Sequence, residues 1–241
     1  HFDIHCGGVD NIFPHHENEI AQSCAASGKQ FVNYWLHNEH LLVDNQKMSK
    51  SMDNYFTLRN LLDKKYSAES IRYTLMSTHY RAKLNFTFDK LRTSQRCINK
   101  LRELKRRLEL IQDRSNCTHP YDSYKKMLIS FSEKLGDDLN ISGALGELFK
   151  WVNEMFAKLD DGSLDYANAQ NSLMVLKEVD KVLGVIDSVI EEDEGIQEYI
   201  DKRNKARDEK DWDLADVIRK QLDDRGIVLE DTADGTIWKK K

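Results

Sequence analysis

From residue 57 onwards, apolar residues recur three and four positions apart along most of the chain. This spacing places them on one face of a helix, so each run predicts an amphipathic helix. Ser67 precedes one run and suits a helix N-cap. We expect a helical bundle, with Trp151 and Met155 in its core. The predicted helices cover residues 57–64, 68–77, 121–135, 142–159, 167–185, 196–210 and 212–225, with a long one inside 81–114.

Before residue 57 the pattern changes to short apolar and aromatic runs, which predict strands. These runs cover residues 2–5, 31–36 and 40–43. Gly7 and Gly8 follow the first run, and Pro14 suits the first position of a helix. The order strand, glycine turn, helix and strand is typical of half of a doubly wound sheet.

The predicted fold class is an α/β remnant, the second half of a Rossmann-type domain, followed by a mainly α-helical bundle and a small α+β C-terminal module. The module ends in a predicted hairpin with strands 227–231 and 236–239. One strand followed by one helix cannot form a nucleotide-binding fold alone, so we infer that the chain is the C-terminal half of a longer protein. The expected domains are residues 1–55, 56–115, 116–190 and 191–241.

Composition narrows the function classes. The chain has 241 residues and a formal net charge of −5, which argues against a simple nucleic-acid coat protein. No run approaches the roughly 20 apolar residues that span a bilayer, so we expect no membrane partner. The four cysteines form no C-x-x-C pair, and reduced thiols in a cytoplasmic protein are expected.

A short loop carries the strongest candidate chemistry. Lys47 and Lys50 lie three positions apart in the string KMSKS, with Ser49 and Ser51 beside them. Two mobile ammonium groups with hydroxyl and loop N–H donors suit the binding of polyphosphate. Asp10 follows the paired glycines and has the chemistry to accept from ribose hydroxyls, although a plain turn fits the same residues.

A second candidate site lies in the helix predicted after Pro14. His15 and Glu19 are four positions apart, so they project from one helix face, as helical metal-ligand pairs do. His16 and Glu19, three positions apart, are a competing pair. A polar, solvated first helical turn is the other interpretation, because acids favour helix N-termini.

Segment 81–114 is strongly basic, with 11 lysines and arginines against 4 acids. A cationic stripe on an otherwise acidic protein favours phosphate contacts along RNA. The alternative is a solvated face of a bundle helix. The stripe consists of Arg92, Arg96, Lys100, Arg102, Lys105, Arg106 and Arg107.

The strings HFDIHCGGVDNIFPHHENEIAQS and YWLHNEHLLVDNQKMSKS together resemble the cysteinyl-tRNA synthetase family of class I aminoacyl-tRNA synthetases. The likeness extends over essentially the whole chain. It implies ATP-dependent ligation of L-cysteine to the tRNA for cysteine through a cysteinyl-adenylate. The family's HIGH signature is absent, so we expect the N-terminal catalytic half to be a missing partner and the chain to be inactive alone.

The resemblance also implies roles for single residues. It makes His15 and Glu19 two of four ligands of one Zn²⁺ per subunit, the other two being cysteines that precede this chain. It places Lys50 on ATP, which binds with Mg²⁺, and gives Lys47 a supporting role in the loop. The residues implied to line the nucleotide site are Gly7, Gly8, Asp10, His5 and His37.

The C-terminal module resembles the family's anticodon-reading domain through the strings DWDLAD at 211–216 and GIVLED at 226–231. Stacking on aromatic side chains and hydrogen bonds to base edges are typical of single-stranded RNA recognition. A small core built around the two tryptophans is the alternative. The candidate tRNA-binding residues are Arg207, Trp212, Asp216, Asp231 and Trp238.

The resemblance assigns residues 1–55 to the nucleotide-binding domain with the KMSKS loop, 56–115 to stem-contact helices, 116–190 to the tRNA-binding bundle and 191–241 to anticodon recognition. Two other functions fit parts of the pattern. One is a cysteine ligase with a small-molecule acceptor, which would not need the last module. The other is a catalytically silent tRNA-binding fragment.

Overall fold

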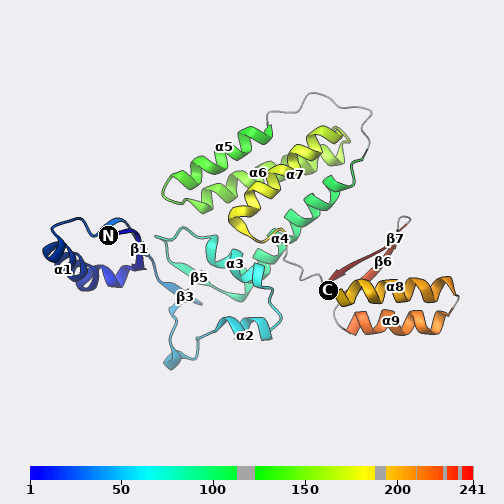
Figure 1. Ribbon diagram of the computed structural model, residues 1–241, viewed down its shortest axis with the longest axis horizontal. Coiled ribbons are helices and arrows are strands. Elements are labelled where there is room, and N and C mark those ends of the chain that lie inside the picture. Colours follow the sequence, from blue (N-terminus) through cyan, green and yellow to red (C-terminus); the bar gives the residue numbers. More distant parts are fainter. Residues whose placement is uncertain (113–122, 188–193, 210, 225–226, 233–234, 241) are drawn as a thin grey trace. The chain divides into compact units, whose positions relative to one another are not determined.

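The computed structural model describes residues 1–112, 123–187, 194–209, 211–224, 227–232 and 235–240. The chain forms two compact units, His1–Asp187 and Ser188–Lys241. Figure 1 shows mixed strands and helices followed by long helices in the first unit. Among the described residues, no helix is long and apolar enough to cross a membrane.

The chain begins with a strand–helix–strand unit. β1 (Phe2–Gly8) pairs in parallel with β2 (Val32–Asn38), and α1 (Glu17–Ser27) lies between them in sequence. The connection after β1 is made by two short helical turns, η1 (Val9–Asn11) and η2 (Ile12–His16). This order of elements is the predicted one.

One local prediction in this unit is wrong, and another agrees with the backbone. β1 continues through Gly7 and Gly8 instead of ending before them, because both glycines pair with β2. Pro14 begins the helical turn that leads into α1, since Phe13 before it is extended (φ −132°, ψ 131°) and His16 and Glu17 after it are helical.

A second, separate sheet has the order β4-β3-β5. β3 (Leu41–Val43) pairs in parallel with β5 (Leu84–Phe86) and antiparallel with β4 (Gln46–Lys47). The turn between β3 and β4 is formed by Asp44 and Asn45, with φ of 47° and 63°. Two left-handed residues in succession make the tight hairpin turn that suits the twist of the strands. The described strands within residues 1–86 therefore form two sheets where one was predicted.

Short helices cover the second sheet. α2 (Leu58–Asp63) and α3 (Ala68–Met76) follow η3 (Lys50–Met52). The side chains of Thr57 and Ser67 accept hydrogen bonds from the backbone N–H three residues later, which satisfies donors that a helix start leaves free. The buried core beneath them consists of Val43, Leu61, Ile71, Phe86 and Leu91.

Four longer helices form the predicted bundle. They are α4 (Phe88–Glu109), α5 (Ser123–Gly136), α6 (Ile141–Asp160) and α7 (Tyr166–Leu183). The apolar face of α4 includes Leu101, Leu104 and Leu108, which are all fully buried. Burial of each such side chain stabilises the folded state by about 1.5–3 kcal/mol. Trp151 and Met155 lie in the same core, as predicted.

The second unit consists of a helical hairpin and a β-hairpin. α8 (Glu194–Asp208) and α9 (Trp212–Asp224) precede β6 (Ile227–Thr232) and β7 (Gly235–Lys240), which pair antiparallel as predicted. Its small core is made by Ile200, Ile218, Leu222, Ile227 and Leu229.

Candidate functional site

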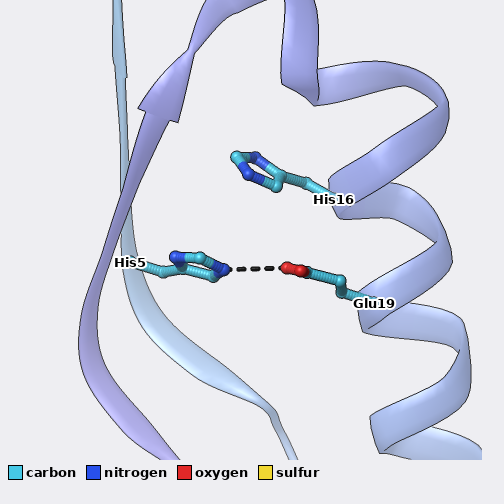
Figure 2. Close-up of side chains that lie close together, drawn as sticks. All are labelled: His5, His16 and Glu19. Carbon is cyan, nitrogen blue, oxygen red and sulfur yellow. Dashed lines mark hydrogen bonds and ion pairs between the residues drawn. The ribbon is translucent and has the colours of Figure 1, made fainter.

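Glu19 lies at the centre of a histidine cluster between β1 and α1 (Figure 2). His5 of β1 donates from Nε2 to Oε2 of Glu19 at 2.8 Å. Nε2 of His15 lies 3.4 Å from the other carboxylate oxygen, Oε1. Each oxygen of the Glu19 carboxylate thus lies near a different histidine, Oε2 near His5 and Oε1 near His15.

A second pair of imidazoles lies beside this carboxylate. His16 is 4% exposed, and its Nδ1 shares a hydrogen bond of 2.8 Å with Nε2 of His37 in β2. The ring of Trp35 lies close to His5 and His16, with centroid distances of 4.7 and 5.0 Å. Trp35 therefore packs, with tilted rings, against both His5 and His16.

Gly7 makes this packing possible. A Cβ at this position would lie 2.5 Å from Cε1 of His16, which real side chains do not tolerate. At Gly8, an added Cβ would collide with the carboxylate of Asp10. Close approach thus requires glycine at Gly7, whereas the exposed Asp10 side chain beside Gly8 can move aside. Both glycines lie at the carboxyl end of β1, the edge where open α/β sheets bind ligands.

The protonation states suit a cation. The hydrogen bond from His5 lowers the pKa of Glu19, so its carboxylate is charged at neutral pH. Burial lowers the pKa of His16, with neighbouring His37 and His5 acting in the same direction, so its ring is neutral. A ring nitrogen of His5, one of His16 and a carboxylate oxygen of Glu19 lie within 4.8 Å of one another.

The structure thus adds partners to the predicted pair. His15 and Glu19 face each other as expected, but the His15 side chain is 66% exposed. Sequence spacing indicated the pair of His16 and Glu19, whereas no spacing rule relates His5 to Glu19, because the packing of α1 against β1 brings them together. Imidazole and carboxylate are zinc ligands, so the donor set fits Zn²⁺. Among the described residues this cluster contains no thiolate, and Cys6 is exposed.

The lysine loop follows the β3–β4 hairpin. Lys47 is exposed at the end of β4, and the half-buried side chain of Met48 packs against the core beneath α2 and α3. Lys50 begins η3, and its side chain lies outside the part of the chain that the structure describes. The loop therefore exposes one cation beside an anchored apolar residue.

Most basic side chains of the stripe on α4 have partners within the chain. Arg102 donates to Glu69 and to the carbonyls of Val185 and Ile186, which follow the end of α7. Arg96 is exposed and forms no ion pair with any described residue. The other stripe residues have partners within the chain: Arg92 with Asp89, Lys100 with Asn153, Lys105 with Asp187, Arg106 with Glu103 and Arg107 with Asp160.

In the second unit, Trp212 begins α9 and is 59% exposed, so it does not serve as a core residue. Asp216 is exposed on the same helix, and Arg207 is half-buried in the last turn of α8. The backbones of Asp231 and Trp238 lie in β6 and β7, but their side chains fall outside the described part.

Three protein families match successive parts of the chain. Residues 1–96 match the tRNA synthetases class I (C) catalytic domain, residues 130–187 the DALR domain and residues 191–238 the cysteinyl-tRNA ligase anticodon binding domain. Two solved structures share the fold. One is a leucyl-tRNA synthetase complex from Agrobacterium radiobacter, with a TM-score of 0.58 and 16% identity over 72% of this chain and 25% of that one. The other is methionyl-tRNA synthetase from Mycobacterium tuberculosis, with a TM-score of 0.54 and 18% identity over 72% of this chain and 39% of that one.

Residues 1–96 thus match the catalytic domain of class I aminoacyl-tRNA synthetases, and the fold is similar to that of two such enzymes. Cysteine–tRNA ligases of Protochlamydia amoebophila and Brachyspira hyodysenteriae are 43% and 44% identical to it, over 99% and 100% of its length. The chain is thus similar to cysteine–tRNA ligases along its whole length. It spans about half the length of these relatives, 51% and 52% respectively.

Proposed function

We propose that the protein carrying this chain ligates L-cysteine to the tRNA for cysteine, using ATP and a cysteinyl-adenylate intermediate. The observation that carries the proposal is the presence, in one chain, of the cluster around Glu19 and the KMSKS loop, within a sequence similar to cysteine–tRNA ligases throughout. We place its action in the cytoplasm, where tRNA is charged.

We assign the amino-acid selection to a zinc ion held by His15 and Glu19. The arrangement that supports this assignment is the division of the Glu19 carboxylate, in which His5 holds Oε2 while Oε1 faces His15. Zinc would supply a coordination position for the thiolate of cysteine, which the hydroxyl of serine fills poorly. A site that senses one group on the substrate in this way discriminates strongly without editing.

The lysine loop would serve the activation step. The cysteine carboxylate attacks the α-phosphate of ATP, the bond to the β-phosphate oxygen breaks, and pyrophosphate leaves. Negative charge shifts onto the departing phosphates, and we assign its stabilisation to Lys47 and Lys50 together with Mg²⁺. Gly7, Gly8, Asp10, His5 and His37 would line the nucleotide side.

The second unit would select the tRNA. Trp212 presents an exposed indole on which an unstacked anticodon base can lie, and Asp216 presents a carboxylate to base edges. We propose Arg207, Asp231 and Trp238 as further contacts. The match of residues 191–238 to an anticodon binding domain favours tRNA over a small-molecule acceptor.

Two reactions test the proposal. Cysteine-dependent exchange between ATP and pyrophosphate reports the adenylate, and charging of tRNA reports the acceptor. We expect both reactions in the intact protein, and we expect residues 1–241 expressed alone to show neither reaction. Exchange without charging would favour the small-molecule acceptor, and tRNA binding without exchange would favour a silent RNA-binding protein.

Metal removal is the complementary test. A chelator that strips zinc should abolish the preference for cysteine over serine, and added Zn²⁺ should restore it. Unchanged preference in metal-free protein would remove zinc from the selection step.

A further inference from the structure

The lysine loop is closed by a side chain that lies outside the KMSKS string. The amide of Asn54 donates from Nδ2 to the carbonyl of Lys47 at 3.1 Å, and its Oδ1 accepts from the N–H of Ser49 at 2.8 Å. These two bonds flank Met48 on either side. A neighbouring strand bonds to a chain in the same way, so the Asn54 side chain substitutes for a strand partner.

Other contacts hold the two ends of this bridge. On one side, Met48 packs against the core that includes Val43 and Leu61. On the other side, Asp53 has a φ of 51°, a left-handed conformation that reverses the chain and returns Asn54 to the start of the loop. The backbone of residues 47–49 is therefore held between apolar packing and the Asn54 amide.

The chemistry of this position requires an amide. The bridge needs one donor and one acceptor on the same short side chain, which asparagine supplies. Aspartate keeps the acceptor but lacks the donor, and alanine lacks both. The Ser49 N–H is half-buried, and losing its partner there removes a bond that water replaces only in part.

We propose that Asn54 is a positioning residue for the lysine loop. By fixing the backbone between Lys47 and Ser49, it sets the places from which Lys47 and Lys50 reach the phosphates of the nucleotide. The inference rests on the proposed function for its catalytic consequence, but the bridge itself can be tested without any activity.

The test compares Asn54→Ala and Asn54→Asp with Asn60→Ala in the intact protein. Asn60 is a matched control, because its side chain caps α2 through Thr57 and does not touch the loop. For Asn54→Ala we expect kcat for ATP–pyrophosphate exchange to fall about 10²-fold, with a small change in KM for ATP. A misplaced catalytic group stabilises the transition state less, while binding of the substrate changes little. The kcat of Asn54→Asp should lie between that of Asn54→Ala and that of the wild type.

Hydrogen exchange of the peptide containing residues 47–49 gives the second readout. It should accelerate in Asn54→Ala and stay at the wild-type rate in Asn60→Ala. Wild-type kcat and wild-type exchange in Asn54→Ala would overturn the inference, and so would an equal kcat loss in Asn60→Ala. If Lys50→Ala retains full activity, the proposed role of the loop fails, while the hydrogen-exchange result still decides whether Asn54 closes it.

Discussion

The histidine cluster and the lysine loop are built in opposite ways. The cluster joins residues far apart in sequence, since His5 and Glu19 are 14 positions apart and His16 and His37 are 21 apart. The loop is closed within eight residues, from Lys47 to Asn54. The cluster pairs His5 with Glu19 and His16 with His37, whereas the loop leaves Lys47 exposed.

This difference matches the tasks that we propose for the two sites. Selecting a thiolate requires ligands held in fixed places, and a network of mutual hydrogen bonds provides that rigidity. Contacts to phosphates that move during a reaction require mobile cations. A short loop in which, among the described side chains, only Met48 packs against the core permits such motion. The comparison predicts that changes in the loop act on rate, while changes in the cluster act on metal binding and stability.

The largest effect is expected in the loop. Lys50→Ala should lower cysteine-dependent exchange by about 10²–10³-fold, the loss typical of removing one group that stabilises transition-state charge. Lys64→Ala, an exposed lysine just after α2, is the matched control and should retain the wild-type rate. Equal rates in both variants would show that the loop does not act in activation.

The cluster should respond through its metal. His5→Ala removes the hydrogen bond that orients Glu19, and loss of such a partner typically lowers metal affinity about 10–100-fold. Competition with a chromogenic chelator measures this directly. Unchanged zinc affinity would mean that Glu19 keeps its orientation without His5, and the contrast between the two sites would be lost.

The packing of the cluster can be tested apart from metal. Gly7→Ala forces a methyl group against His16 and should lower the free energy of unfolding by about 1–3 kcal/mol. Gly146→Ala in α6, where nothing lies within 4 Å of the added methyl, should instead stabilise by about 0.5–1 kcal/mol. Chemical denaturation of both variants measures the difference, and equal effects would contradict the close approach at Gly7.

The smallest effect on activation is expected in the second unit, which belongs to neither site. Trp212→Ala should leave exchange unchanged and weaken tRNA charging by about tenfold, as loss of one stacked base typically does. Measuring KM for tRNA in both proteins tests this. Unaltered charging would remove Trp212 from the anticodon contacts.

The sequence by itself determined the parts of the molecule that depend on local contacts. Helical spacing predicted the bundle helices, Ser67 predicted a helix start, and the KMSKS string identified the loop, because each depends on residues within a few positions of one another. The pair of His15 and Glu19 was predictable for the same reason.

Only the tertiary structure decided which groups meet across the chain. Packing of η2 and α1 against the strands brought His5 to Glu19 and His37 to His16. Packing likewise brought Asp187 to Lys105 and Asp160 to Arg107 of α4. The split into two sheets was decided in the same way. Such contacts depend on how elements pack, and residue spacing carries no information about packing partners tens of positions away.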